Sequence, residues 1–72
     1  MVGKKWRSGK VRDFDQKTEM GIIEDDDGES MVFHVSEVVQ GASLKQGALV
    51  HFEADVTKMG MFARKITVLE EE

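Results

Sequence analysis

The chain contains no cysteine and no proline, and its aromatic residues are limited to one tryptophan and four phenylalanines among 72 residues. Without cysteine, the protein forms no disulfide, no thiolate metal site and no cysteine nucleophile. Its apolar runs are only a few residues long, far short of the roughly 20 that a membrane-spanning helix needs. The basic N-terminus also lacks the apolar stretch of a signal peptide. We therefore expect a cytoplasmic protein with no membrane partner.

Residue types that carry out catalysis are equally scarce. Two histidines and scattered acids form no triad, and no pair of residues has the spacing for acid–base or nucleophilic work. The acidic run at residues 25–29 (DDDGE) lacks the alternating ligands and the distal glutamate of an EF-hand calcium loop, so we interpret it as a solvated turn. The sequence therefore predicts no enzymatic activity, no metal and no cofactor.

Charge is distributed unevenly along the chain. Residues 1–12 contain five basic and no acidic side chains, whereas residues 13–72 contain five basic and 14 acidic ones, for a net charge of −4 overall. An isoelectric point near 5.1 argues against general nucleic-acid binding, which needs clustered lysine and arginine. A basic stripe on one face would still attract phosphates despite the negative total. The alternative is that the basic segment only keeps the N-terminus soluble.

Short strands separated by polar turns fill the chain. Alternating apolar residues predict strands at residues 5–14, 20–24, 30–35, 48–55 and 61–69. The strongest turn signal is Asp27-Gly28, between two apolar strands, and a loop is expected at 40–47. A short helical turn is expected at 36–39, with Ser36 as its N-cap.

The size of the chain allows one domain, near the lower limit for a protein that folds without disulfides. We expect a single domain over residues 1–72, with its core at about 8–69, a basic arm at 1–7 and an acidic tail at 70–72. Five short strands in so small an all-β domain are typical of an antiparallel Greek-key barrel of the oligonucleotide-binding (OB) type.

Alternation within each strand predicts which side chains face the barrel interior. The predicted inward residues are Gly21, Ile23, Met31, Phe33, Val50, Phe52, Ala63, Ile66 and Val68. The spacing of the last three requires a bulge. The predicted outward residues are Met20, Ile22, Val32, His34, His51 and Glu53.

Five segments resemble the cold-shock domain family in their order and spacing. The family motif G-K-V-K-W-F-N is similar to GKVRDFD at 9–15, and K-G-F-G-F-I is similar to TEMGII at 18–23. The motif V-F-V-H-F-S resembles MVFHVS at 31–36, L-x-x-G-x-x-V-x-F-E resembles LKQGALVHFE at 44–53, and G-P-x-A-x-x-V resembles GMFARKI at 60–66. The resemblance implies the family's five-stranded barrel and its binding of single-stranded RNA or DNA.

The family binds by laying bases flat on exposed aromatic rings beside a basic groove. Carried over by position, five of those rings fall on residues without an aromatic side chain: Asp13, Met20, Ile22, Val32 and Val35. Losing five rings at about 1 kcal/mol each would weaken binding by more than about a thousandfold. The resemblance therefore implies weak binding with little sequence preference.

A nucleic-acid site is still predicted from the residues that match. Lys10 and Arg12 are expected to meet phosphates, and Phe14 and His34 to contact bases. The surface beneath the bound nucleic acid would be an apolar floor formed by Met20, Ile22 and Val32. By resemblance, the role would lie in regulating transcription or translation, or in RNA chaperoning.

The sequence leaves alternative roles open for the remaining aromatic and apolar residues. Trp6, among basic residues, and Phe62 would replace missing rings, or Trp6 would cover one end of the barrel and Phe62 would pack in the core or at its rim. Phe14 is assigned equally to packing and to binding. The outward side chains of Met20, Ile22, Val32 and Val35 would otherwise form an apolar patch for a protein partner, in a module that has lost most nucleic-acid binding. We expect a monomer.

Overall fold

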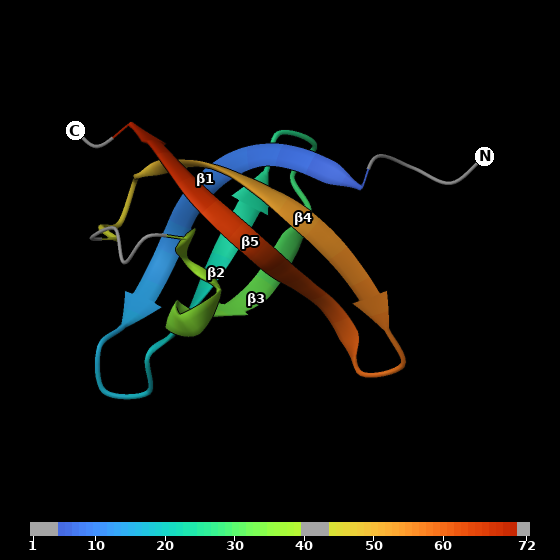
Figure 1. The fold of residues 1–72 in the computed structure, drawn as a ribbon, viewed down its shortest axis with the longest axis horizontal. Helices are drawn as coiled ribbons and strands as arrows, with labels where there is room; N and C mark the ends of the chain where they lie inside the picture. The colour runs from blue at the N-terminus through green and yellow to red at the C-terminus, as the bar shows by residue number, and fades with distance from the viewer. Residues whose placement is uncertain (1–4, 40–43, 71–72) are drawn as a thin grey trace.

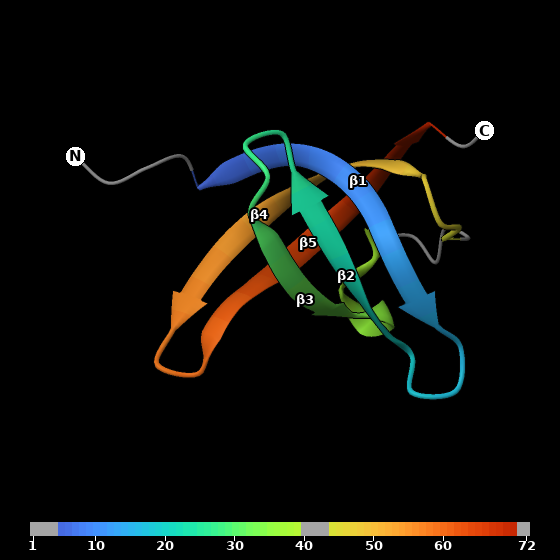
Figure 2. The same ribbon diagram turned by 180° about the vertical axis from the view of Figure 1, so that it is seen from behind.

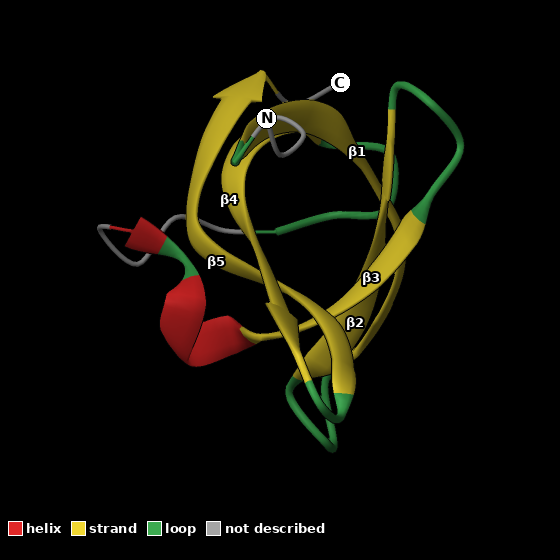
Figure 3. Cartoon of the chain, turned by 90° about the vertical axis from the view of Figure 1, so that its right-hand side faces the viewer, coloured by secondary structure: helices red, strands yellow, loops and turns green. Residues whose placement is uncertain are grey.

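The computed structural model describes residues 5–39 and 44–70, apart from the side chain of Glu70. Its elements are β1 (Trp6–Asp15), β2 (Met20–Asp25), β3 (Ser30–His34), the 3₁₀ helix η1 (Val35–Glu37), β4 (Leu49–Thr57) and β5 (Gly60–Glu70) (Figure 1). The strands close into a barrel in the order β1-β2-β3-β5-β4, and Figure 3 shows them encircling the core. The prediction of a five-stranded all-β barrel is confirmed.

The barrel is antiparallel except where it closes. β1 pairs antiparallel with β2 and with β4, β2 with β3, and β4 with β5. β3 and β5 run parallel and share only the pair Val32 and Phe62. Beyond η1, a second parallel bridge joins Val38 to Ile66. The barrel is therefore antiparallel, as predicted, apart from this short parallel junction.

The barrel interior is filled by ten apolar side chains. They are Val11, Ile23, Met31, Phe33, Val38, Ala48, Val50, Phe52, Ala63 and Ile66. Each such aliphatic or aromatic side chain contributes about 1.5–3 kcal/mol on burial. The alternation predicted for β2, β3 and the first half of β4 is confirmed, whereas Val68 of β5 is only half-buried.

Bulges in β1 and β5 set which residues of these strands face inward. In β1 the register shifts between Val11 and Asp13, so Arg12 is the extra residue. Val11 and Phe14, three residues apart, can then both face the interior. In β5 an extra residue lies opposite Phe52, where Lys65 has a left-handed backbone (φ 51°). The bulge predicted for β5 is confirmed.

Gly21 of β2 leaves room for two close neighbours, the Asp13 backbone of β1 and the Phe33 ring of β3. A Cβ atom at this position would lie 2.5 Å from the carbonyl oxygen of Asp13 and 2.7 Å from the ring of Phe33. That ring also stacks on Phe14, with centroids 6.1 Å apart and planes 9° from parallel. Glycine is required here because no side chain fits between the backbone and the ring.

The segment after β3 differs from its prediction. η1 begins at Val35, and its N-cap is His34, whose side chain accepts a hydrogen bond from the backbone N–H of Ser36. Ser36 is therefore not the cap. Val35 packs against the core rather than standing outward beside Val32, so it does not belong to the predicted apolar patch.

Strands β1 and β5 extend into the segments expected to form the basic arm and the acidic tail. Trp6 and Arg7 lie in β1, which agrees with the strand predicted at 5–14, and Glu70 ends β5. Residues 1–4, 40–43 and 71–72, which include parts of the predicted arm, loop and tail, lie outside the described residues. Over residues 5–39 and 44–70, no helix has the length and apolarity to span a membrane.

Candidate nucleic-acid interface

The outer face of β1, β2 and β3 carries most of the predicted binding residues. Across β2 and β3, Ile22 lies opposite Val32 and Met20 lies opposite His34. Lys10 of β1 lies opposite Glu24 of β2. Directly opposite residues on antiparallel strands share a face, so these side chains form one surface. We call this surface the β1–β3 face.

A hollow of about 910 Å³ lies on the β1–β3 face. Its lining residues are Asp13, Phe14, Asp15, Gln16, Lys17, Met20, Gly21, Ile22 and Val32. Phe14 is half-buried, and its ring stacks on Phe33 of the core while also lining the hollow. Phe14 therefore packs against the core and also presents part of its ring to the hollow.

A second hollow of about 330 Å³ lies where β3 meets β5. It is lined by Met20, Val32, Phe33, His34, Glu37, Asp55, Phe62, Ala63 and Arg64. Met20 and Val32 line both hollows, so the two adjoin. Phe62, opposite Val32, is half-buried at the rim of this second hollow rather than in the core. The apolar surface of the β1–β3 face therefore continues onto β5.

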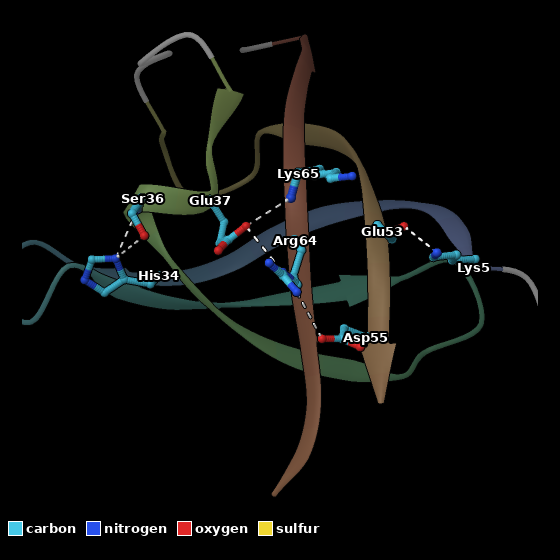
Figure 4. A network of polar contacts seen from close by, with 8 residues as sticks. All are labelled: Lys5, His34, Ser36, Glu37, Glu53, Asp55, Arg64 and Lys65. Atoms are coloured by element: carbon cyan, nitrogen blue, oxygen red, sulfur yellow. Dashed lines mark hydrogen bonds and ion pairs between the residues drawn. The ribbon is translucent and has the colours of Figure 1, made fainter. Parts of the chain in front are cut away.

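The imidazole of His34, the N-cap of η1, is held in one orientation by Ser36 (Figure 4). Its Nδ1 accepts a hydrogen bond from the backbone N–H of Ser36 at 3.0 Å and lies 2.9 Å from the Ser36 hydroxyl. Because a backbone N–H can only donate, the neutral ring carries its proton on Nε2. That Nε2–H lies 4.0 Å from a carboxylate oxygen of Glu19. His34 thus presents a hydrogen-bond donor at the edge of the second hollow.

Arg64 of β5 lies across the same hollow between two acids (Figure 4). Its Nε is 3.7 Å from Oε1 of Glu37, and its Nη1 is 3.5 Å from Oδ2 of Asp55. Glu37 in turn accepts a hydrogen bond from the backbone N–H of Lys65 at 3.4 Å. Half of the Arg64 side chain is exposed, so these contacts orient its guanidinium without enclosing it.

A family model described as the 'Cold-shock' DNA-binding domain matches residues 7–69 of the chain. The chain belongs to this family. It is therefore a cold-shock domain, and the partner of such a domain is a nucleic acid.

The fold agrees with a solved member. A structure of drosophila Unr CSD456 superposes with a TM-score of 0.78 at 18% sequence identity, over 97% of this chain. The chain spans only 29% of that chain's length, and at this identity the likeness concerns the fold alone. No curated protein matches the sequence.

The charged residues on the outer face of this cold-shock domain are mixed in sign. Lys10 is exposed, and Arg12 reaches across β2 to place its Nη1 3.4 Å from the hydroxyl of Ser30. Exposed acids stand close by on the same strands and the following turn: Asp13, Asp15, Glu19 and Glu24. The two predicted phosphate ligands therefore act against a local excess of carboxylates, which weakens attraction to phosphate.

Trp6 does not close an end of the barrel. It is 45% exposed and stacks on His51 of β4, with ring centroids 5.3 Å apart and planes 10° from parallel. Neither residue lines the two hollows of the β1–β3 face. His51, predicted as a plain surface histidine, is half-buried under this stack.

The basic residues expected around Trp6 are paired with acids. Arg7 Nη1 lies 2.9 Å from Asp25 and 2.6 Å from Glu29, and these hydrogen bonds raise the pKa of the guanidinium further. Lys5 lies 3.0 Å from Glu53 (Figure 4), and its hydrogen bond lowers the pKa of that carboxyl group. Glu53 lies on the outer face opposite Trp6, as predicted, yet only 9% of it is exposed. Lys4 lies outside the described residues.

Proposed function

We propose that this cold-shock domain binds single-stranded RNA or DNA on the β1–β3 face, weakly and with little sequence preference. The observation that supports this proposal is the pair of adjoining hollows that share Met20 and Val32. Phe14 lines one hollow and Phe62 lines the other, so two rings are available to a strand that crosses both. Stacking on rings tolerates any base, because every base has a π-face.

Each predicted residue has a role in this arrangement. Lys10 and Arg12 pair with backbone phosphates, and Phe14 stacks on a base. His34 donates a hydrogen bond from Nε2 to a base edge or a phosphate. The apolar floor beneath the bases consists of the side chains of Met20, Ile22 and Val32.

Two residues of β5 extend the proposed site. Phe62 supplies a second ring, and base–aromatic stacking contributes about 1–3 kcal/mol per base. Arg64, oriented by Glu37 and Asp55, faces the same hollow as Phe62 and supplies a positive charge beside that ring. Phe62 thus offsets part of the loss at the five non-aromatic positions, while the nearby carboxylates keep the overall affinity low.

The wider role follows from this chemistry. A monomeric domain that holds single strands weakly and without sequence preference suits RNA chaperoning or the regulation of transcription and translation in the cytoplasm. The proposed activity is binding alone, without an enzymatic step.

Titration of labelled oligo-dT and oligo-U at two salt concentrations tests the proposal. Binding should weaken as salt rises and weaken further in Lys10→Ala and Arg12→Ala, because each removes one phosphate contact. Lys45→Ala removes an exposed lysine that lines neither hollow, so its affinity should match the wild type. Absence of any NMR chemical-shift change on β2 and β3 with both oligonucleotides would refute the proposed site.

That negative result would favour the protein-contact alternative, in which the same apolar residues meet a partner protein. Ile22→Asp would then keep the fold and abolish capture of that partner, because it places a charge in the middle of the patch. An unchanged set of captured proteins would count against the alternative as well.

A further inference from the structure

The Trp6–His51 stack has no role in the proposed nucleic-acid site. Trp6 is the sole tryptophan of the chain, and nearly half of its surface is exposed. It lies on the outer face of β1 and β4, where its register partner is Glu53. The stack at 5.3 Å holds the indole in place by one face, and the rest of the ring is open to solvent. Exposed aromatic surface of this kind is typical of a binding site.

A third hollow, of about 500 Å³, opens beside this stack. Its lining residues are Trp6, Arg7, Ser8, Asp25, Asp26, Asp27, Glu29 and His51. The turn between β2 and β3 forms its other wall and lies against the start of β1 (Figure 2). The backbone N–H of Asp26 donates to the carbonyl of Ser8 at 3.1 Å, which fixes the turn to the strand.

The shape of this wall is set by one buried carboxylate. Asp25 accepts hydrogen bonds from the backbone N–H groups of Asp27 at 3.0 Å and Glu29 at 2.8 Å, and from Arg7 at 2.9 Å. Burial alone would raise the pKa of Asp25, but these three hydrogen bonds outweigh it and lower the pKa. Asp25 is therefore charged and structural, and Arg7 is matched by Asp25 and Glu29.

The charges left facing the hollow are negative. Four carboxylates and one guanidinium line it, which gives a net charge of −3 with histidine neutral. Asp26 and Asp27 are exposed, and among residues 5–39 and 44–70 neither carboxylate has a hydrogen-bond or ion-pair partner. Such a wall repels phosphate. The same wall attracts a cation, and a planar cation can also lie flat on the exposed part of the Trp6 ring.

We propose that this third hollow binds the arginine side chain of a basic peptide segment. A guanidinium is planar, so it stacks on Trp6 while its N–H groups reach the carboxylates of Asp26 and Asp27. An ammonium group lacks the flat face and the fork of donors, so arginine fits better than lysine. The site is separate from the proposed nucleic-acid site and does not depend on it.

Fluorescence of Trp6 reads this site directly, because no other tryptophan contributes. The probe is the peptide acetyl-Gly-Arg-Gly-Arg-Gly-amide, and the matched control peptide carries citrulline, the neutral isostere, in place of arginine. The arginine peptide should give a saturable change, and the citrulline peptide should bind about tenfold more weakly or worse, because it lacks the charge.

Paired protein variants locate the effect. The double variant Asp26→Asn, Asp27→Ser should weaken binding of the arginine peptide by about tenfold, because it removes both unpaired carboxylates. The control variant Asp13→Asn, Asp15→Asn removes two carboxylates from the β1–β3 face and should bind the peptide as the wild type does. Both variants change exposed side chains, so their thermal unfolding midpoints should match the wild type.

Five outcomes would overturn the proposal, and the first four come from the titrations. They are no saturable change with the arginine peptide, equal binding of the citrulline peptide, wild-type binding by the Asp26→Asn, Asp27→Ser variant, and a stronger response of Trp6 to an oligonucleotide than to the peptide. A Trp6 signal that depends on protein concentration without peptide would assign the hollow to a second copy of the chain and would also overturn it.

Discussion

The inner and outer sides of β2 and β3 are built under different constraints. On the inner side, Gly21, Ile23, Met31 and Phe33 fill a closed space in which one added carbon would touch a backbone oxygen or a ring. On the outer side, Met20, Ile22 and Val32 lie partly exposed, in contact with solvent. Packing therefore constrains the identity of an inward residue, whereas an outward residue can change without loss of the fold. A cold-shock barrel can thus keep its architecture while its binding surface diverges.

The sharpest test of this contrast is Gly21→Ala. The added methyl group would meet the Asp13 carbonyl oxygen and the Phe33 ring at 2.5–2.7 Å, so the strands must separate. We expect a loss of about 1–3 kcal/mol in the free energy of unfolding, a large fraction for so small a domain. Chemical denaturation measures it. Val32→Ala, on the outer side of the adjacent strand, should cost clearly less; equal losses would contradict the contrast.

The second prediction tests an inward residue that is charged rather than apolar. Asp25→Asn should lower the free energy of unfolding by about 1–2 kcal/mol at pH 7, because Arg7 loses a charged acceptor. The folded-state pKa of Asp25 is lowered, so its stabilisation is present above the ordinary pKa of 3.8 and is lost as the pH falls through the folded value. The gap between wild type and variant should therefore narrow in acid.

Denaturation at pH 7 and near pH 3 measures that gap. Asp26→Asn is the matched control. Asp26 is the exposed neighbour of Asp25, so its substitution should change the free energy of unfolding little at either pH. A gap between wild type and Asp25→Asn that stays constant with pH would show that the ionised carboxylate is not what holds the turn.

The third prediction concerns the outer side. Phe62→Ala should weaken oligonucleotide binding by about fivefold or more, because it removes one stacking ring from the second hollow. Its cost in stability should be modest, since the side chain is only half-buried. Val56→Ala changes a side chain on the neighbouring strand that is 70% exposed and lines neither hollow, so it should bind normally. Fluorescence anisotropy of a labelled strand measures both.

Sequence alternation was sufficient where a side chain's direction depends only on its own strand. It predicted the inward set Ile23, Met31 and Phe33 because strand side chains alternate with a period of two. It predicted that β5 needs a bulge because Ala63 and Ile66 break that period. The positions of Lys10, Met20, Ile22, Val32 and His34 on one face followed from the same rule and from the family resemblance.

Alternation failed where the direction depends on a contact between distant segments. A one-residue bulge reverses every side chain beyond it, so the inward turn of Phe14 could not be predicted without the β1–β2 register. The place of Phe62 and Arg64 beside His34 depends on the single β3–β5 pair. The ion pairs of Arg7 with Asp25 and of Lys5 with Glu53 likewise join residues far apart in the sequence. Each of these contacts is long-range and leaves no periodic signal.

The last prediction concerns Glu19, a residue that affects both the stability of the fold and the charge of the binding surface. Glu19 has a left-handed backbone (φ 62°) at the entrance to β2, and its carboxylate lies 4.0 Å from His34 Nε2. Its position corresponds to a glycine in the family motif that the 18–23 segment resembles. Glu19→Gly should stabilise the fold by about 1 kcal/mol, because glycine adopts this conformation without a Cβ clash.

The same change removes a negative charge from the edge of the β1–β3 face, so it should also tighten oligonucleotide binding by a few-fold. Glu19→Gln separates the two effects, since it removes the charge but keeps the strained backbone. We expect tighter binding in both variants and a higher unfolding midpoint only in Glu19→Gly, measured by anisotropy and thermal denaturation. If Glu19→Gln were stabilised equally, charge repulsion rather than backbone conformation would be the cost at this turn, and the outer surface would constrain the fold after all.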